Sequence, residues 1–98
     1  MELTSKQRAQ LRSLATNMDT IVHVGKDGIG DNLVKQVNDA LEARELIKGK
    51  VLESAPQTAR EAAEALAAAV DATVVHVMGR TFVLYRPAKE PQLRLPRA

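Results

Sequence analysis

Residues 20–34 read TIVHVGKDGIGDNLV, and in this stretch a strand pattern passes into a helix pattern through a glycine-rich loop. Residues 20–24 are short and rich in β-branched side chains, which favours a strand. From Asp31 onward, apolar residues recur at the three- and four-residue spacing of one helical face, and Gly30 or Asp31 can serve as the N-cap. The sequence therefore predicts a unit of strand, glycine loop and helix.

A further helix is predicted before this unit, over residues 4–18. Thr4 and Gln7 have the spacing of a capping box, in which each residue hydrogen-bonds the backbone of the other. One face of this helix is apolar and consists of Leu11, Leu14, Ala15 and Met18. We expect that face to pack on the core.

The second half of the chain predicts three more strands and one more helix. A strand is expected at 46–52, an alanine-rich helix with its own capping box at 58–70, and a hairpin within 73–86 that turns around Met78-Gly79-Arg80. The expected order is α-β-α-β-α-β-β, an α/β fold in which helices cover a four-stranded mixed sheet.

Length and composition limit the possible functions. The 98 residues suffice for one domain, placed at residues 1–86, and the Pro-rich basic tail at 87–98 is expected to be disordered. The chain has no cysteine, which excludes disulfides and thiolate chemistry. Its start does not resemble a signal peptide, so we expect a cytoplasmic protein. Basic and acidic side chains balance within residues 1–86, so any nucleic-acid surface requires segregation of charge onto one face.

Histidines and aromatic residues give no sign of catalysis or base stacking. His23 and His76 lie among apolar neighbours without a catalytic motif, so packed or edge-strand histidines are expected. Phe82 and Tyr85 have opposite strand parity, which predicts one core and one surface residue and no shared stacking platform. We predict a protein that is not an enzyme and that needs no metal or cofactor.

The glycine loop is the strongest candidate site. Gly25, Lys26, Asp27 and Gly28 form a GxxG sequence between a strand and a helix start. Such glycines can let backbone N–H groups approach a phosphate, as in the nucleic-acid clamp of KH domains, or they can simply form a turn. From the loop alone both interpretations stay open.

Cations on three elements could extend such a site. Alternation along the strand at 46–52 places two lysines together on one face, and the first helix carries three basic residues away from its apolar face. Arg80 and Arg86, which bracket the last strand, are weaker candidates for phosphate contact. The set that could converge on the loop is Lys6, Arg8, Arg12, Lys26, Lys48 and Lys50.

Four blocks of the sequence, in order and with similar spacing, resemble the CRM domain family (chloroplast RNA splicing and ribosome maturation) in its stand-alone bacterial YhbY form. The blocks are LTSKQRAQLRSLA, IVHVGKDGIGDNLV, ALEARELIKGKVL and VMGRTFVLYRP, which together span about residues 2–87. The sequence departs from the family pattern in having Gly28-Ile29-Gly30 where GLT is usual, and Arg44 where a histidine often precedes ELIK.

The resemblance implies a fold similar to the C-terminal domain of bacterial translation initiation factor three, with a KH-like GxxG loop that binds RNA. It implies association with ribosomal RNA of large-subunit precursors, a role in ribosome assembly, and no enzymatic activity. By position, the RNA-binding residues are those of the loop and the cations of the first helix, and we expect a monomer.

Two other functions stay open at this point. A protein-interaction module could dock on the ribosome through a sheet edge, and replacing Lys26 would then have no effect. A small enzyme acting on a phosphorylated metabolite would need a catalytic group near the loop, and only Asp27 or Asp31 could supply one.

Overall fold

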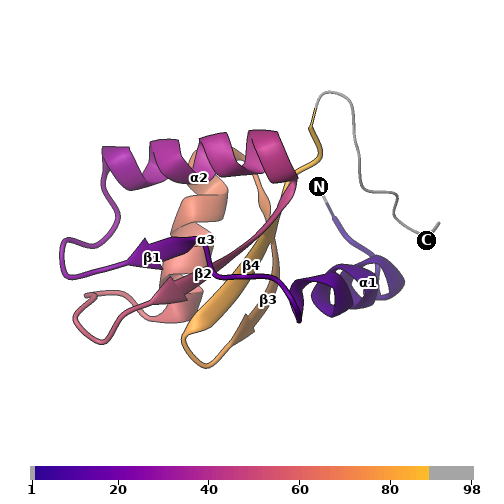
Figure 1. Cartoon of the computed structure of the whole chain (residues 1–98), viewed down its shortest axis with the longest axis horizontal. Coiled ribbons are helices and arrows are strands. Elements are labelled where there is room, and N and C mark those ends of the chain that lie inside the picture. The colour runs from indigo at the N-terminus through magenta and orange to yellow at the C-terminus, as the bar shows by residue number, and fades with distance from the viewer. Residues whose placement is uncertain (1, 89–98) are drawn as a thin grey trace.

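The structure is a computed structural model that describes residues 2–88, with three helices and four strands (Figure 1). The elements follow the predicted α-β-α-β-α-β-β order, which is confirmed. From residue 89 onward, the predicted tail lies outside the described residues. In chain order the elements are α1 (Ser5–Ala15), β1 (Val22–Val24), α2 (Asp31–Arg44), β2 (Leu46–Val51), α3 (Ala59–Val70), β3 (Thr73–Met78) and β4 (Thr81–Tyr85).

The four strands form one mixed sheet in the order β1-β2-β4-β3. The β1 and β2 strands are parallel and are connected through α2, while β4 pairs antiparallel with both β2 and β3. The predicted mixed sheet is thus confirmed, with β2 and β4 as its inner strands. Both capping boxes are also present, at Thr4 with Gln7 and at Thr58 with Glu61.

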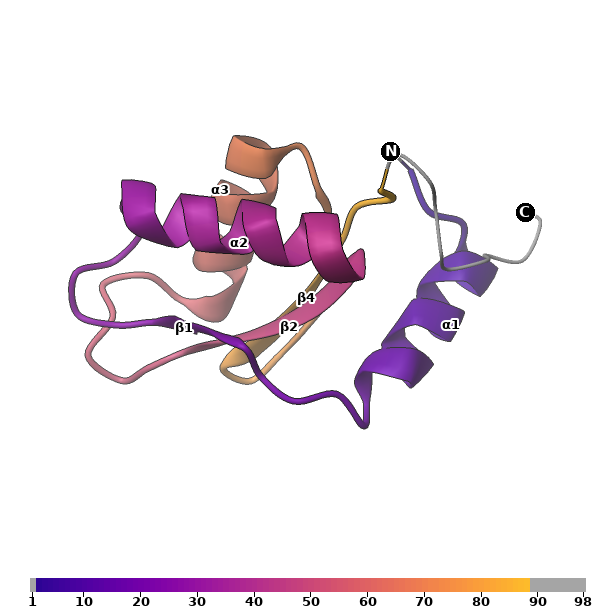
Figure 2. The same cartoon turned by 45° about the horizontal axis from the view of Figure 1, so that its top comes forward.

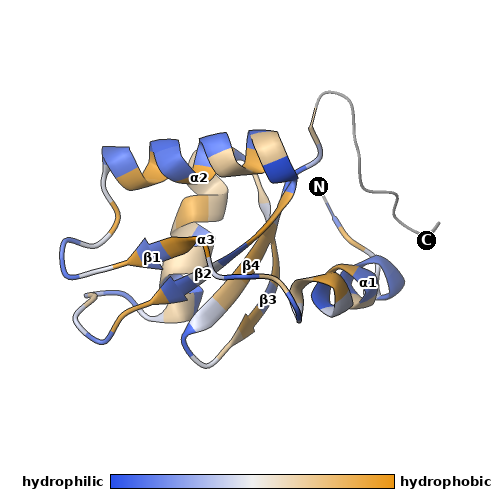
Figure 3. Cartoon of the chain, viewed as in Figure 1, coloured by the Kyte–Doolittle hydropathy of each residue, from blue (hydrophilic) through white to orange (hydrophobic). Residues whose placement is uncertain are grey.

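The larger core lies between one face of the sheet and the two helices α2 and α3. Alanines at 62, 63 and 67 let α3 approach the strands closely, so the core is filled by aliphatic side chains and one phenyl ring. Figure 3 shows the hydrophilic residues of α2 on the side that faces away from the sheet. The largest buried side chains of this cluster are Leu41, Ile47, Leu66, Phe82 and Leu84.

A smaller core lies on the opposite face, beneath α1. Neighbouring residues of a strand point to opposite faces, so Ile47 belongs to the larger core and Leu46 to the smaller one. Tyr85 is only 2% exposed in this second core, so the expectation that either Phe82 or Tyr85 lies at the surface is wrong. Burial, and next the nearby Glu45 carboxylate, raise the pKa of Tyr85 above its ordinary value of 10.0.

The α1 helix is shorter and buries a narrower face than its sequence predicts. It ends at Ala15, and Leu14 is 44% exposed instead of packing on the core. At about 100° per residue, Ala15 lies within about 40° of Leu11, whereas Leu14 lies about 60° to the other side of Leu11. A single helix that packs on a sheet buries only one stripe of its own surface, and Leu14 lies outside that stripe.

Gly49 of β2 provides a test of the larger core. It lies directly opposite Phe82 of β4, and a Cβ atom at Gly49 would overlap the Phe82 ring. We expect Gly49→Ala to lower the free energy of unfolding by about 1–3 kcal/mol, because the fully buried ring has no free space to enter. Urea denaturation monitored by circular dichroism measures this loss.

The matched control is Gly25→Ala, where the nearest atom to an added Cβ is Leu52 Cδ1 at 3.9 Å. This variant is expected to keep the stability of the wild type or to exceed it slightly. Equal stability of the two variants would contradict the packing described here.

Candidate functional site

The glycine loop is a closed turn that connects β1 to α2. The Gly28 N–H donates to the Gly25 carbonyl oxygen at 3.0 Å, which makes residues 25–28 a hydrogen-bonded β-turn. Gly28 has a φ of 68°, and a Cβ there would lie 3.1 Å from Pro56 Cγ. The positive φ favours glycine at position 28, and the close approach of the 54–58 loop adds to this preference.

Gly25 is not required in this way. It does not have a positive φ, and an added Cβ would meet only Leu52 Cδ1, at 3.9 Å. Lys26 and Asp27 are exposed at the tip of the turn, and within residues 2–88 their N–H groups donate to no backbone carbonyl. The fold thus explains the glycine at position 28 but not the one at position 25. The N–H groups of Lys26 and Asp27 are available to a ligand.

The helix that follows the turn begins without a side-chain cap. Its N-cap is Gly30, so no side-chain oxygen satisfies the first N–H groups of α2. These groups carry the positive end of the helix dipole. Turn and helix start together present backbone donors, with the Lys26 ammonium group close by in the sequence.

The two strand lysines lie on the face of the sheet that carries α1. Lys50 is exposed and stands opposite His23, two residues before Gly25, so it is the strand cation closest to the turn. Lys48 is half-buried on the same face. His23 is an exposed residue of the edge strand β1, and His76 is half-buried on the other edge strand, β3. Both histidines are edge-strand residues, which confirms that expectation.

The cations of α1 do not gather around the turn. Figures 1 and 2 show α1 at the opposite end of the molecule's long axis from the loop that leads into α2. The convergence of six cations on one point is therefore not found. Lys6 and Arg12 are exposed on α1, whereas Arg8 is half-buried.

Arg8 has a structural role that its sequence position does not reveal. Its Nη1 donates to the carbonyl oxygens of Val74 and Val75, at 2.6 and 2.7 Å. The pairing of β3 with β4 shifts register between Val74 and His76, and the guanidinium binds at this irregularity. Arg8 thereby attaches α1 to the edge of the sheet.

Arg86 is another arginine that stabilises the fold. Its guanidinium donates to Asn38 Oδ1 at 2.9 Å, to the Val70 carbonyl oxygen at 2.7 Å and to Glu42 Oε1 at 2.8 Å. These bonds join α2 and α3 to the end of β4. Arg80, in contrast, is exposed in the hairpin turn and forms an ion pair with Glu53 at 3.3 Å.

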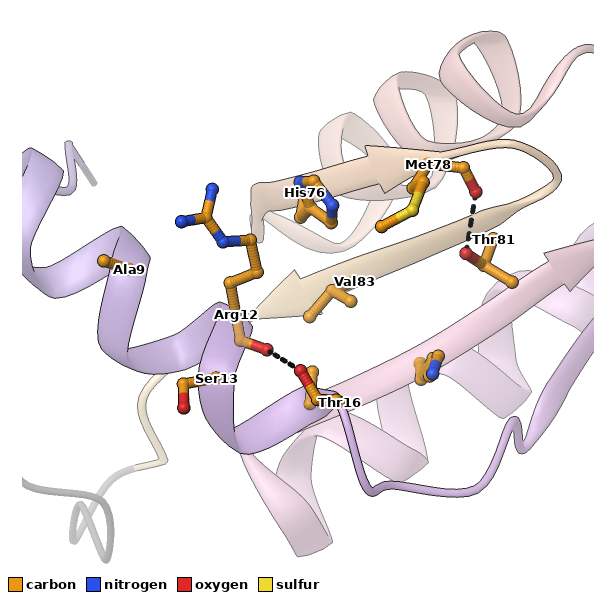
Figure 4. A pocket seen from close by; sticks show the side chains of 10 residues that line it. Ala9, Arg12, Ser13, Thr16, His76, Met78, Thr81 and Val83 are labelled. Atoms are coloured by element: carbon orange, nitrogen blue, oxygen red, sulfur yellow. Dashed lines mark hydrogen bonds between the residues drawn. The ribbon is translucent and has the colours of Figure 1, made fainter.

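A groove of about 470 Å³ lies between α1 and the strands β2, β4 and β3 (Figure 4). The groove could not be predicted from the sequence, because it depends on where α1 crosses the sheet. Only the shared face of Lys48 and Lys50 pointed toward it. Its wall combines cations with apolar and hydroxyl groups, and the residues that matter below are Arg12, Thr16, Lys48, His76, Met78 and Thr81.

Residues 2–88 provide neither a metal site nor a membrane-spanning helix. This part of the chain holds no group of three or more histidine and carboxylate side chains that could bind a metal ion. It also contains no helix of the length and apolarity needed to cross a membrane.

The chain is similar to a known protein family, to named relatives and to a solved structure. The model of the CRS1/YhbY (CRM) domain family matches residues 3–86. A Bacillus subtilis protein named probable RNA-binding protein YqeI is 45% identical over 95 residues, covering 96% of this chain and 99% of its own. A Haemophilus influenzae protein named RNA-binding protein is 33% identical, covering 97% and 96%. The solution structure of a Staphylococcus aureus protein matches with a TM-score of 0.80 and 45% identity, over 97% of this chain and all of the other.

The role of Arg8 can be tested by replacing it. We expect Arg8→Gln to lower the free energy of unfolding by about 1–3 kcal/mol, because two partly buried carbonyl oxygens lose a charged donor. Thermal or urea denaturation measures the loss. Arg12→Gln, on the exposed side of the same helix, removes the same charge and is expected to change stability by less than about 0.5 kcal/mol. Equal losses in both variants would show that Arg8 does not hold α1 in place.

Proposed function

Because this chain belongs to the CRS1/YhbY (CRM) domain family, we propose that it binds RNA and that the Gly25–Gly28 turn contacts RNA phosphates. The observation that carries the proposal is the exposed turn directly before the uncapped start of α2. Its tip carries Lys26, and the fold gives no reason for glycine at position 25. The names of the Bacillus subtilis and Haemophilus influenzae relatives support RNA as the ligand.

The chemistry of the turn suits a phosphodiester. Free N–H groups at a helix start favour an anion, and a missing Cβ lets a backbone phosphate approach the main chain. Lys26 adds a mobile charged donor, whereas the exposed Asp27 adds no attraction for a phosphate. The turn therefore supplies positioned donors with little net charge, which favours a shaped RNA site over nonspecific adhesion.

We further propose that the RNA is large-subunit ribosomal RNA within precursor particles, and that the protein acts in ribosome assembly in the cytoplasm as a monomer without enzymatic activity. The support is the resemblance to the stand-alone bacterial YhbY form. Residues 1–86 are the binding domain in this proposal, and the basic tail at 87–98 either adds electrostatic attraction or takes no part. Of the other cations expected to bind RNA, Lys50 lies close to the turn and Lys48 follows along β2, whereas α1, at the other end of the domain (Figure 1), carries Lys6, Arg8 and Arg12.

The loop contact predicts a loss of RNA affinity when its tip is removed. We expect the double variant Lys26→Ala, Asp27→Ala to bind large-subunit ribosomal RNA fragments at least about tenfold more weakly than the wild type. The loss of one phosphate contact should also reduce the slope of log affinity against log salt concentration by about 0.7 to 0.9. Fluorescence anisotropy across a salt series measures both quantities.

The matched control is the double variant Lys35→Ala, Asp39→Ala, which also removes one lysine and one aspartate. These residues form an exposed ion pair on α2, with 3.3 Å between Lys35 Nζ and Asp39 Oδ2, and we expect wild-type affinity. If both double variants bind like the wild type, the loop does not contact RNA, and a protein-interaction module becomes the better account. Absence of RNA binding by the wild type would overturn the proposed function as a whole.

A further inference from the structure

The face of the sheet that carries α1 is only partly covered. The α1 helix shields the end of this face where Leu46 and Tyr85 are buried, and it leaves Lys50 exposed at the other end. Lys50 stands opposite His23, close to the turn, and Lys48 follows on the same face about 7 Å farther along the strand. Lys48 and Arg12 then line the groove. Lys50, Lys48 and Arg12 thus form a row of cations that extends from near the turn, across the sheet, to the groove.

The groove itself combines cations with a planar and apolar wall. Figure 4 shows Arg12 reaching out from α1, and His76 and Met78 on the strand across from it. Met78 is 64% exposed, more than any other large apolar side chain within residues 2–88. No carboxylate is among the described residues that line the groove. This wall is complementary to a ligand that carries both a negative charge and a flat ring.

Two hydroxyl groups add a further preference. Thr16 Oγ1 donates to the Arg12 carbonyl oxygen at 3.1 Å, and Thr81 Oγ1 donates to the Met78 carbonyl oxygen at 2.8 Å. In this arrangement the two hydroxyl oxygens are available to accept hydrogen bonds from a ligand. The groove therefore offers oxygen acceptors beside its cations.

From these observations we propose that the groove between α1 and the sheet is a second RNA contact, which takes one nucleotide of a single-stranded segment leading away from the Gly25–Gly28 turn. The proposal rests on the proposed function and deepens it. The phosphates of this segment pass Lys50 and Lys48, and the base lies against Met78 and His76 beside Arg12. The volume of about 470 Å³ is within the range of about 300–1,000 Å³ typical of small-ligand sites.

RNA fits this surface better than an acidic peptide does. Both would match the cations, and both carry donors for the hydroxyls of Thr16 and Thr81, but the acidic side chains of a peptide have no flat ring to lie against His76 and Met78. In RNA the 2′-hydroxyl can donate to these threonines, and it also distinguishes RNA from DNA. A flat base gains contact with Met78 and with the His76 ring.

The test compares single-stranded RNAs of increasing length in anisotropy titrations. The starting RNA is just long enough to contact the turn. Adding two or three nucleotides to it should raise its affinity for the wild-type protein. The double variant Lys48→Gln, Lys50→Gln should lose this gain and about 1.4 units of the salt slope, at about 0.7 per lost phosphate contact. Met78→Ser should weaken binding of the longer RNA about three- to tenfold.

Matched controls separate these effects from general loss of charge or apolar surface. Lys35→Gln with Arg60→Gln removes two exposed cations from α2 and α3, and Leu14→Ser removes an exposed apolar side chain from α1. Both controls should behave like the wild type. Photocrosslinking of wild-type protein to RNA containing 4-thiouridine gives a second measurement that needs no variant, and crosslinks within residues 76–83 are expected.

The outcomes distinguish the groove from the loop. If the groove variants keep the full length-dependent gain while loss of the loop tip still weakens binding, the groove proposal is overturned and the proposed function stands. Equal affinity for DNA of the same sequence, or displacement of the longer segment by an acidic peptide, also overturns it. If the wild type binds no RNA, both proposals fail.

Discussion

The central constraint on this structure is that the inner strand β2 must be covered on both faces by layers of unequal size. Ile47, Gly49 and Val51 face α2 and α3, which cover their side of the sheet with a continuous aliphatic core. Leu46 faces the other way, toward α1. A helix of 11 residues is about 16 Å long and cannot shield a four-stranded sheet, so the same strand presents Lys48 and Lys50 where the cover ends. The open, cationic part of the face follows from this mismatch.

Some charged side chains maintain the fold, whereas others remain available to a ligand. Within residues 2–88, Arg8 and Arg86 each donate more than one hydrogen bond to backbone carbonyl oxygens of distant elements. Lys26, Lys50 and Arg12 are exposed and take no part in the ion pairs found among residues 2–88. A domain with balanced total charge can thus present cations on one face, because its carboxylates lie largely on α2, α3 and the loops.

Local patterns were sufficient to predict the order of the elements. Capping boxes at Thr4 and Thr58 and the helical spacing after Asp31 depend only on neighbours a few residues away, and the structure confirms them. The exposure of Leu14, the burial of Tyr85 and the groove could not be predicted, because all three depend on where α1 crosses the sheet. That position is fixed by contacts such as Arg8 with Val74, which are 66 residues apart in the sequence. The site is similarly divided: the turn was predictable from its glycines, whereas the groove was not.

Gly25 gives the most direct test of the account, because the fold explains glycine at position 28 and offers no reason for it at position 25. The measurement is the affinity of Gly25→Ala for a large-subunit ribosomal RNA fragment, made beside its free energy of unfolding. If the turn binds a phosphate, Gly25→Ala gives a folded protein of at least wild-type stability that binds RNA about tenfold or more weakly, since the added methyl group keeps the phosphate from the main chain. Unchanged affinity in a folded variant would contradict it and would leave the glycines of this loop with the role of a turn.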